Sequence, residues 1–215
     1  QLKAKALRLF WQQYYPTNVL TPLAPSPFGR GYRTVTKRRA FHARSSVKLG
    51  LISPTEEGSY KPFDVVQCAI EPPGHAHIYR KIQEILEKSY AAPLAEALSY
   101  VIIKGSYAEF TLILNVREAT PEVVKATNTL SKSLTHFFKE IVGLFLYEDQ
   151  SDGRYYLASL TGRRAAVRKV FGKAGVYQRI CGRSFLYSPL SFSQVNLSIV
   201  DSFVTTAGDL LNLSG

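Results

Sequence analysis

Apolar positions recur at helical spacing near the start of this chain and at strand spacing further along it. Residues 1–15 are predicted to form a helix that Pro16 ends. The apolar stripe of this helix is made of Leu7, Phe10, Trp11 and Tyr14. Residues 16–31 are rich in Pro, Gly, Ser and Thr and predict a connecting loop. Residues 32–52 then show a strand-like pattern with a turn near Ser45.

The central part of the chain alternates strand-like and helix-like segments. The predictions are a strand at 65–70, a helix at 77–89, strands at 100–104 and 109–116, a helix at 121–141 and a strand at 144–148. Thr120 is the expected cap of the second helix, and Pro121 its first residue. This order is typical of the split β-α-β, or ferredoxin-like, block. We therefore expect an α+β fold whose antiparallel sheet contains this block, flanked by basic strands and terminal helices.

The last third of the chain predicts more hairpins and a second terminal helix. We expect a turn at 151–153 followed by a strand at 155–158. A strand pair at 176–180 and 184–187 and a helix at 195–213 should follow. Ser191 or Ser193 is the expected cap of that helix. We expect the two terminal helices to pack on each other or on a second copy of the chain.

These predictions divide the chain into three parts. Residues 1–31 form the first helix and its linker, residues 32–190 the central α+β domain, and residues 191–215 the last helix.

Length and composition narrow the class of protein. The chain has 215 residues and 46% hydrophobic residues, enough for a real core. No apolar run approaches the roughly 18 residues of a membrane span, so we expect no membrane partner and a cytoplasmic location. Two cysteines, Cys68 and Cys181, cannot form a disulfide framework. The chain starts at Gln1 and contains no methionine, which indicates a partial product.

The net charge of +11 is unevenly distributed along the chain. Residues 1–50 carry ten Lys or Arg and no acid, whereas residues 51–152 carry nine basic and fourteen acidic residues. Residues 153–215 carry eight basic residues and two acids. Two basic ends around an acidic middle favour a surface that faces a polyanion, and nucleic acid is the expected partner. The alternative is a basic surface that only keeps the protein soluble.

Basic residues in the predicted strand pair at 32–52 are interleaved with Tyr32 and Phe41. Strands show alternate side chains on one face, so such a pair could contact phosphates and stack on bases. The candidate RNA-binding residues are Arg33, Lys37, Arg38, Arg39, Arg44 and Lys48. An ordinary sheet with one polar face would show a similar pattern.

Motifs of common catalytic sites are absent from the sequence. It has no G-x-S-x-G, no G-x-x-x-x-G-K and no strand-linked G-x-G-x-x-G. His75 and His77 lie two residues apart, a spacing that some metal sites use, but no third ligand lies nearby in the sequence. Both are better explained as polar residues at the start of a helix.

One segment is more specific than the rest. Residues 188–196 read S-P-L-S-F-S-Q-V-N, which on local chemistry suits a strand-to-helix turn. The segment also resembles the S-P-x-S-F-F-Q-V-N signature of the RNA (uracil-5-)-methyltransferase family, and departs from it only at Ser193, where the family usually has a second Phe.

Three earlier segments resemble the same family, in the family's order. Residues 1–5 are similar to the Q-L-x-x-K that follows a three-cysteine iron–sulfur motif in bacterial members. Residues 32–51 are similar to Y-R-x-K…F…L-G-F, and residues 65–68 to the segment with the fourth cluster cysteine.

The resemblance implies roles for three sets of residues. Cys68 would be the fourth ligand of a 4Fe–4S cluster in the intact parent; its three partners would precede Gln1, so no cluster is expected in this chain. Otherwise Cys68 is a buried strand cysteine. Gln194 would contact S-adenosylmethionine, and the basic residues of 33–48 would help to hold the RNA.

The family's reaction transfers a methyl group to uracil C5 after a cysteine attacks C6, while a carboxylate removes the C5 proton. The resemblance places the nucleophile, the base and the methyl-donor loop beyond residue 215, so we expect this chain alone to bind no cofactor and to have no catalytic residues. We expect the RNA-binding central part of an RNA uracil-5 methyltransferase that acts on rRNA or tRNA. The alternative is a stand-alone RNA-binding module without enzymatic activity, and a third reading is an α+β scaffold with no specific partner.

Overall fold

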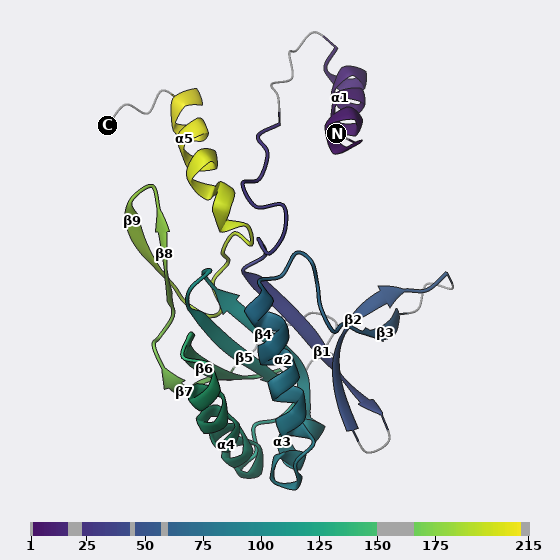
Figure 1. The fold of residues 1–215 in the computed structure, drawn as a ribbon, viewed down its shortest axis with the longest axis vertical. Coiled ribbons are helices and arrows are strands. Elements are labelled where there is room, and N and C mark those ends of the chain that lie inside the picture. Colours follow the sequence, from purple (N-terminus) through teal and green to yellow (C-terminus); the bar gives the residue numbers. More distant parts are fainter. Residues whose placement is uncertain (1, 17–22, 44–45, 57–59, 150–165, 212–215) are drawn as a thin grey trace.

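The computed structural model describes residues 2–16, 23–43, 46–56, 60–149 and 166–211. Its centre is a seven-stranded sheet in the order β3-β2-β1-β4-β5-β6-β7 (Figure 1). The strands of this sheet are β1 (Val35–Ala43), β2 (Ser46–Pro54), β3 (Tyr60–Asp64), β4 (Leu98–Gly105), β5 (Phe110–Val116), β6 (Ile141–Glu148) and β7 (Ala166–Gly172). A separate hairpin consists of β8 (Val176–Ile180) and β9 (Arg183–Tyr187).

Helices cover one face of the sheet, which we call the helix face. The α-helices are α1 (Leu2–Tyr14), α2 (Pro73–Leu86), α3 (Ala92–Ala97), α4 (Pro121–Phe137) and α5 (Val200–Leu210). Of these, α2, α3 and α4 lie against the sheet (Figure 1). Their apolar stripes and the strand residues beneath them form the main core, with Ile78, Leu94, Leu112, Leu130 and Leu144 fully buried. The molecule therefore has a mixed α/β architecture.

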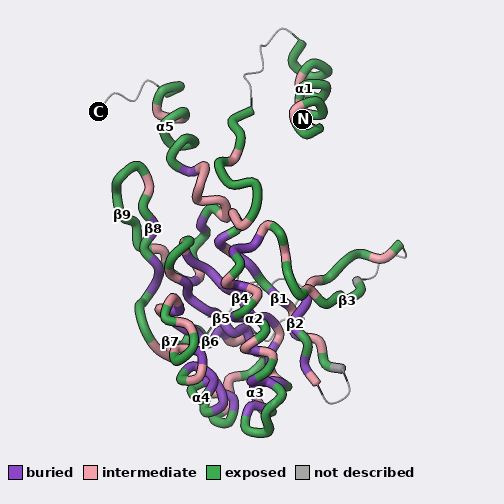
Figure 2. The backbone as a smooth tube through the Cα atoms, in the orientation of Figure 1, coloured by how far each residue is buried: buried purple, intermediate pink, exposed green. Residues whose placement is uncertain are grey.

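The two central strands, β4 and β5, are buried on both faces (Figure 2). Strands buried on both sides have near-continuous apolar sequences, as in Val101-Ile102-Ile103 and Leu112-Ile113-Leu114. On the face away from the helices, which we call the second face, a smaller core cluster includes Ile102, Ile113 and Phe145. Leu190, from the segment after β9, packs against it.

The sheet is mixed, which corrects the predicted antiparallel sheet with its split β-α-β block. The crossover helix α4 connects β5 to β6, and these two strands lie side by side and pair in parallel. The split arrangement needs a third strand between them. All other neighbouring strands in the sheet pair antiparallel.

The strand predicted at 65–70 is also wrong, and β1 takes the place beside β4. These residues form a loop whose backbone is tied to the chain before β1: Gly31 donates to the Ala69 carbonyl over 3.0 Å and Arg33 to that of Ile70 over 2.8 Å. A short apolar run cannot be assigned to a strand by hydrophobicity alone, and Val66 is in fact 69% exposed.

Other local predictions hold. The Thr120 hydroxyl accepts a hydrogen bond from the Val123 amide, and Pro121 is the first residue of α4. The hairpin β8–β9 turns at Cys181 and Gly182, with φ values of 47° and 78°, as a two-residue type I′ turn requires. The Cys181 amide in this strained turn donates to Asp201 of α5 over 2.9 Å.

The terminal helices are almost entirely uncovered. No residue of α1 is buried, and Val200 is the one buried residue of α5. The prediction that these helices pack on each other is therefore wrong; packing on a second copy stays a prediction. No helix in the described ranges is both long and apolar enough to cross a membrane. The turn and strand predicted at 151–158 lie outside the described residues.

Candidate nucleic-acid interface

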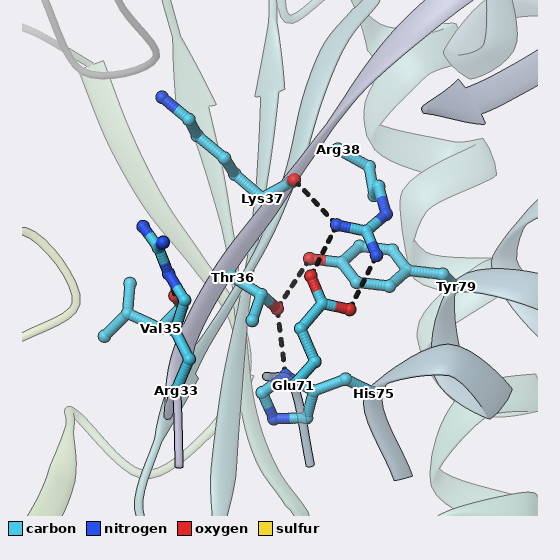
Figure 3. A network of polar contacts seen from close by, with 8 residues as sticks. All are labelled: Arg33, Val35, Thr36, Lys37, Arg38, Glu71, His75 and Tyr79. Carbon is cyan, nitrogen blue, oxygen red and sulfur yellow. Dashed lines mark hydrogen bonds and ion pairs between the residues drawn. The ribbon is translucent and has the colours of Figure 1, made fainter. Parts of the chain in front are cut away.

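Strand β1 presents different side chains to the two faces of the sheet. Thr36 and Arg38 point toward α2 on the helix face, while Arg33 and Lys37 point to the opposite side (Figure 3). This alternation follows from the period of two in a strand. Arg33 and Lys37 are exposed, and partial burial together with the charge of Arg33 lowers the pKa of Lys37.

The strand register adds two cations to the second face. Arg39 follows Lys37 by two residues, and Phe41, again two residues on, pairs with Lys48 of β2. Residues directly opposite in a sheet project to the same side. We call these four residues the basic strip: Arg33, Lys37, Arg39 and Lys48.

Aromatic rings accompany the basic strip. The Arg39 guanidinium lies 6.0 Å from the ring centre of Phe41 and 5.9 Å from that of Tyr100 on β4. A guanidinium at this distance is attracted to the face of a ring, which limits its motion. The structure thus brings four of the six predicted RNA-binding residues to one face, beside the aromatic Phe41.

Arg38 is buried, so its prediction as an RNA-binding residue is wrong. Its side chain is 2% exposed and donates two hydrogen bonds to the Glu71 carboxylate, over 2.5 and 2.6 Å (Figure 3). Its guanidinium also lies 4.8 Å from the ring centre of Tyr79. The pair ties the loop before α2 to β1, so Arg38 has a structural role in the core. Arg44 lies outside the described residues.

A hydroxyl on the helix face of β1 completes this buried network. Thr36 Oγ1 lies 2.9 Å from both His75 Nδ1 and the Tyr79 hydroxyl (Figure 3). Burial, and then the charge of Arg38, lower the pKa of His75 to about 4, so the ring is neutral near pH 7. Burial raises the pKa of Tyr79. His75 is therefore a core residue, while His77 is exposed on α2.

The segment 188–196 packs beside the basic strip. The amide and the hydroxyl of Thr34 both donate to the Val195 carbonyl, over 2.8 and 3.1 Å, and Arg33 forms an isolated bridge with Asn196. The Lys104 ammonium donates to the carbonyls of Ser188, Pro189 and Ser191. Burial lowers the pKa of Lys104 to about 8. One lysine of β4 thus fixes the beginning of the segment, and the two residues directly before Val35 of β1 fix its end.

These bonds explain why the predicted helix cap is wrong. Residues 195 and 196 pair with Thr34 and Arg33, directly before β1, so the helical backbone begins later, with a 3₁₀ turn at Leu197–Ile199 and then α5. Ser191 instead donates to the Ser188 carbonyl over 2.9 Å. Ser193 is 6% exposed, and its hydroxyl has no hydrogen-bond partner among the described residues.

The two residues linked to cofactors by resemblance lie in different surroundings. Gln194 is exposed at the end of the 188–196 segment. Cys68 is half-buried in the loop between β3 and α2, and the other cysteine, Cys181, is in the distant β8–β9 hairpin. A 4Fe–4S cluster needs four ligands, and in the described part of the chain no three potential ligands gather. The described residues alone therefore do not supply the ligand set of a cluster.

Sequence reasoning missed Lys104 and Glu71, which organise this region. The sequence contained a sign of each. Lys104 stands at the end of an apolar strand, and Glu71 stands next to a Pro-Pro pair in an apolar loop. A charged residue in such a place needs a partner if it is buried. The identity of that partner depends on the strand order, which local patterns do not provide.

Comparison with known proteins shows a likeness at the level of the fold. No protein-family model matches the chain, and no curated protein has a matching sequence. Among solved structures, the fold is similar to that of Pyrococcus abyssi tRNA (uracil-54, C5)-methyltransferase in complex with S-adenosyl-L-homocysteine. The TM-score is 0.67 at 15% identity, over 97% of this chain and 47% of that protein. The chain thus spans about half the length of that protein, and the likeness concerns the fold.

Proposed function

We propose that this chain is the RNA-contacting central part of an RNA uracil-5 methyltransferase that acts on tRNA or rRNA. The observation that carries the proposal is the basic strip: three cations from two paired strands, and Arg33 directly before the first of them, on one face of the sheet. Phosphates are the densest anions that such a strip could meet, and each contact releases counterions. The strip would hold the RNA backbone without reading its sequence.

Two observations support a methyltransferase rather than an unrelated RNA-binding fold. The fold is similar to that of a tRNA uracil methyltransferase solved with S-adenosyl-L-homocysteine. Residues 188–196, which resemble the family's signature, pair with Arg33 and Thr34, directly before the strand that carries Lys37 and Arg39. RNA on the strip would then lie beside the segment that leads toward a catalytic domain.

In the intact protein, Gln194 would contact S-adenosylmethionine, which supplies the methyl group. Its side chain is exposed and is therefore accessible to a cofactor held by another domain. The nucleophile and the base of the reaction would come from that domain. A stand-alone RNA-binding module would use the same strip, but would need no such contact.

Salt-dependent RNA binding tests the role of the strip. The chain and a variant with Arg33, Lys37, Arg39 and Lys48 changed to Ala are titrated into labelled single-stranded RNA between 50 and about 200 mM salt. Each lost phosphate contact lowers the slope of log K against log salt by about 0.7, so the variant should lose roughly 3 units of slope. The matched control removes four exposed cations near the helix face: Arg80, Lys88, Lys125 and Lys132.

The control should keep the slope of the unmodified chain, because its charges lie away from the strip. Equal losses in both variants would mean that the net charge alone attracts RNA. Undetectable binding of the unmodified chain at low salt would overturn the proposal.

The exposed apolar surface of α5 belongs to the same proposal. Phe203 and Leu210 of α5 are 65% and 79% exposed, and Leu211 directly after the helix is 68% exposed. We expect this helix to associate with a second copy when no catalytic domain covers it.

A further inference from the structure

A hollow of about 210 Å³ lies between the second face of the sheet and the 188–196 segment. Its floor comes from three strands, through Val35, Ile102 and Ile113. Its roof comes from the segment itself, through Leu190, Phe192, Ser193 and Val195. We call this hollow the motif pocket. Because Lys104 holds the segment by three carbonyls, the roof is fixed in place.

The size of the motif pocket limits what it can hold. An apolar cavity of about 150 Å³ accepts benzene, whereas pockets for drug-sized ligands start near 300 Å³. At about 210 Å³ the motif pocket suits a single six-membered ring with its substituents, and is small for two fused rings.

The chemistry of the walls points to a flat ring with a polar edge. Most wall residues are aliphatic, and Lys104 is occupied by the carbonyls of the roof. Of the two serines in the wall, Ser191 donates to the Ser188 carbonyl, whereas Ser193, 6% exposed, has a hydroxyl without a partner in the described part of the chain. A buried hydroxyl without a partner is unfavourable, and a ligand with a hydrogen-bonding edge would relieve it.

The position of the motif pocket relates it to the basic strip. Val35, in the floor, stands between Arg33 and Lys37 on the same side of β1. Arg33 Nε also donates to the Val35 carbonyl over 3.1 Å, so one cation of the strip is held at the pocket. A strand of RNA whose phosphates follow the strip would present its bases to this opening.

We propose that the motif pocket takes one unstacked pyrimidine base of the bound RNA, with its polar edge on the Ser193 hydroxyl. The proposal rests on RNA binding by the basic strip. Recognition of single-stranded RNA generally uses bases that are splayed out of the stack. The pocket is enclosed by this chain's own sheet and the 188–196 segment, whereas the nucleophile and the base of the reaction would lie on another domain, so we assign to the pocket a base next to the methylated nucleotide. Ser193 stands where the resembling family usually has Phe, and the small side chain leaves the space open.

Binding of oligouridine and oligoadenosine of equal length tests the proposal, because their backbone charge is the same. The chain should bind oligouridine about fivefold or more tightly, the effect of one hydrogen-bonded base. Ser193→Phe should fill the pocket and remove this preference, leaving oligoadenosine binding unchanged. The matched control Ser53→Phe adds the same ring at an exposed position of β2 and should keep the preference. The melting temperature of Ser193→Phe should not fall, since the ring occupies an existing hollow.

A second measurement needs no variant. Crosslinking with 4-thiouridine RNA, followed by mass spectrometry, should label residues 189–195 or the start of β1. RNA binding without a uridine preference, or with adducts only on the helices, would overturn the proposal and leave the basic strip standing. Absence of any RNA binding would overturn both.

Discussion

His75 is fully buried beside a guanidinium, and its protonation is therefore tied to folding. Its imidazole contacts the Thr36 hydroxyl through Nδ1 and lies edge-to-face with the ring of Phe110, with ring centres 4.7 Å apart. Burial and Arg38 lower its pKa to about 4, against about 6.5 in the unfolded chain. Between these values the unfolded chain binds more protons, so stability is complete above pH 6.5 and is lost as the pH falls toward 4.

We predict that His75 contributes about 3 kcal/mol to the loss of unfolding free energy between pH 7 and pH 4. Urea denaturation at both pH values measures it. His75→Asn, which keeps a polar group near the Nδ1 position, should remove most of this dependence, whereas His77→Asn on the exposed side of α2 should keep it. Equal pH dependence in all three proteins would contradict the assignment.

The ion pair between Arg38 and Glu71 is a second buried charge system. Removing one member leaves the other charged and buried, which typically costs about 3–5 kcal/mol. Glu71→Ala should therefore lower the unfolding free energy by that amount in urea denaturation. Lys173→Ala breaks the exposed pair with Glu109, 2.7 Å long, and should cost less than about 1 kcal/mol.

A double variant separates the attraction between the two charges from the cost of burying them. Arg38→Met with Glu71→Leu replaces both charges by apolar side chains and should recover most of the stability lost in Glu71→Ala. If the double variant is as unstable as the single one, the two side chains are not coupled as the geometry indicates.

At the scale of elements, Lys104 joins the 188–196 segment to the sheet. Lys104→Met should loosen this segment while the sheet stays folded, because three carbonyls lose their donor. Hydrogen exchange of the amides in 188–195 should accelerate by about tenfold or more, equivalent to about 1.4 kcal/mol of local opening. Lys132→Met on the exposed side of α4 is the control and should leave these amides protected.

Elements with strong local signals could be predicted from the sequence. α4 starts at Pro121 after its Thr120 cap, and the β8–β9 turn falls on Cys181 and Gly182. Local chemistry is sufficient there, since a cap and a type I′ turn involve only neighbouring residues.

The faces of β1 could not be predicted in the same way. Both alternating sets of its side chains are polar, with Thr36 and Arg38 in one set and Lys37 and Arg39 in the other. A shift of one residue exchanges the two sets, and only contacts with α2 decide which is buried. The same dependence on distant contacts hid the loop at 65–70, whose backbone partners lie more than thirty residues earlier in the chain.

At the scale of the whole molecule, α5 is apolar but almost uncovered. We predict concentration-dependent self-association of the chain through this helix, measured by sedimentation velocity. Phe203→Ser combined with Leu210→Ser should shift the chain toward monomer by removing two large exposed side chains. Thr206→Ser, also exposed on α5, should leave association unchanged. A chain that is monomeric at all concentrations would contradict the prediction.

The hydrogen bonds between Thr34 and Val195 also limit the order in which parts of the fold can form during synthesis. These residues are 161 positions apart, so β1 is made long before the segment that packs beside it. β4, the other neighbour of the strip, also pairs with β1 and follows it by about sixty residues in the sequence. A ribosome-bound chain that has not yet released residues 188–196 would carry the cations of β1 without the roof of the motif pocket. Such distant pairing slows folding, and the pocket should form last, after most of the chain has left the ribosome.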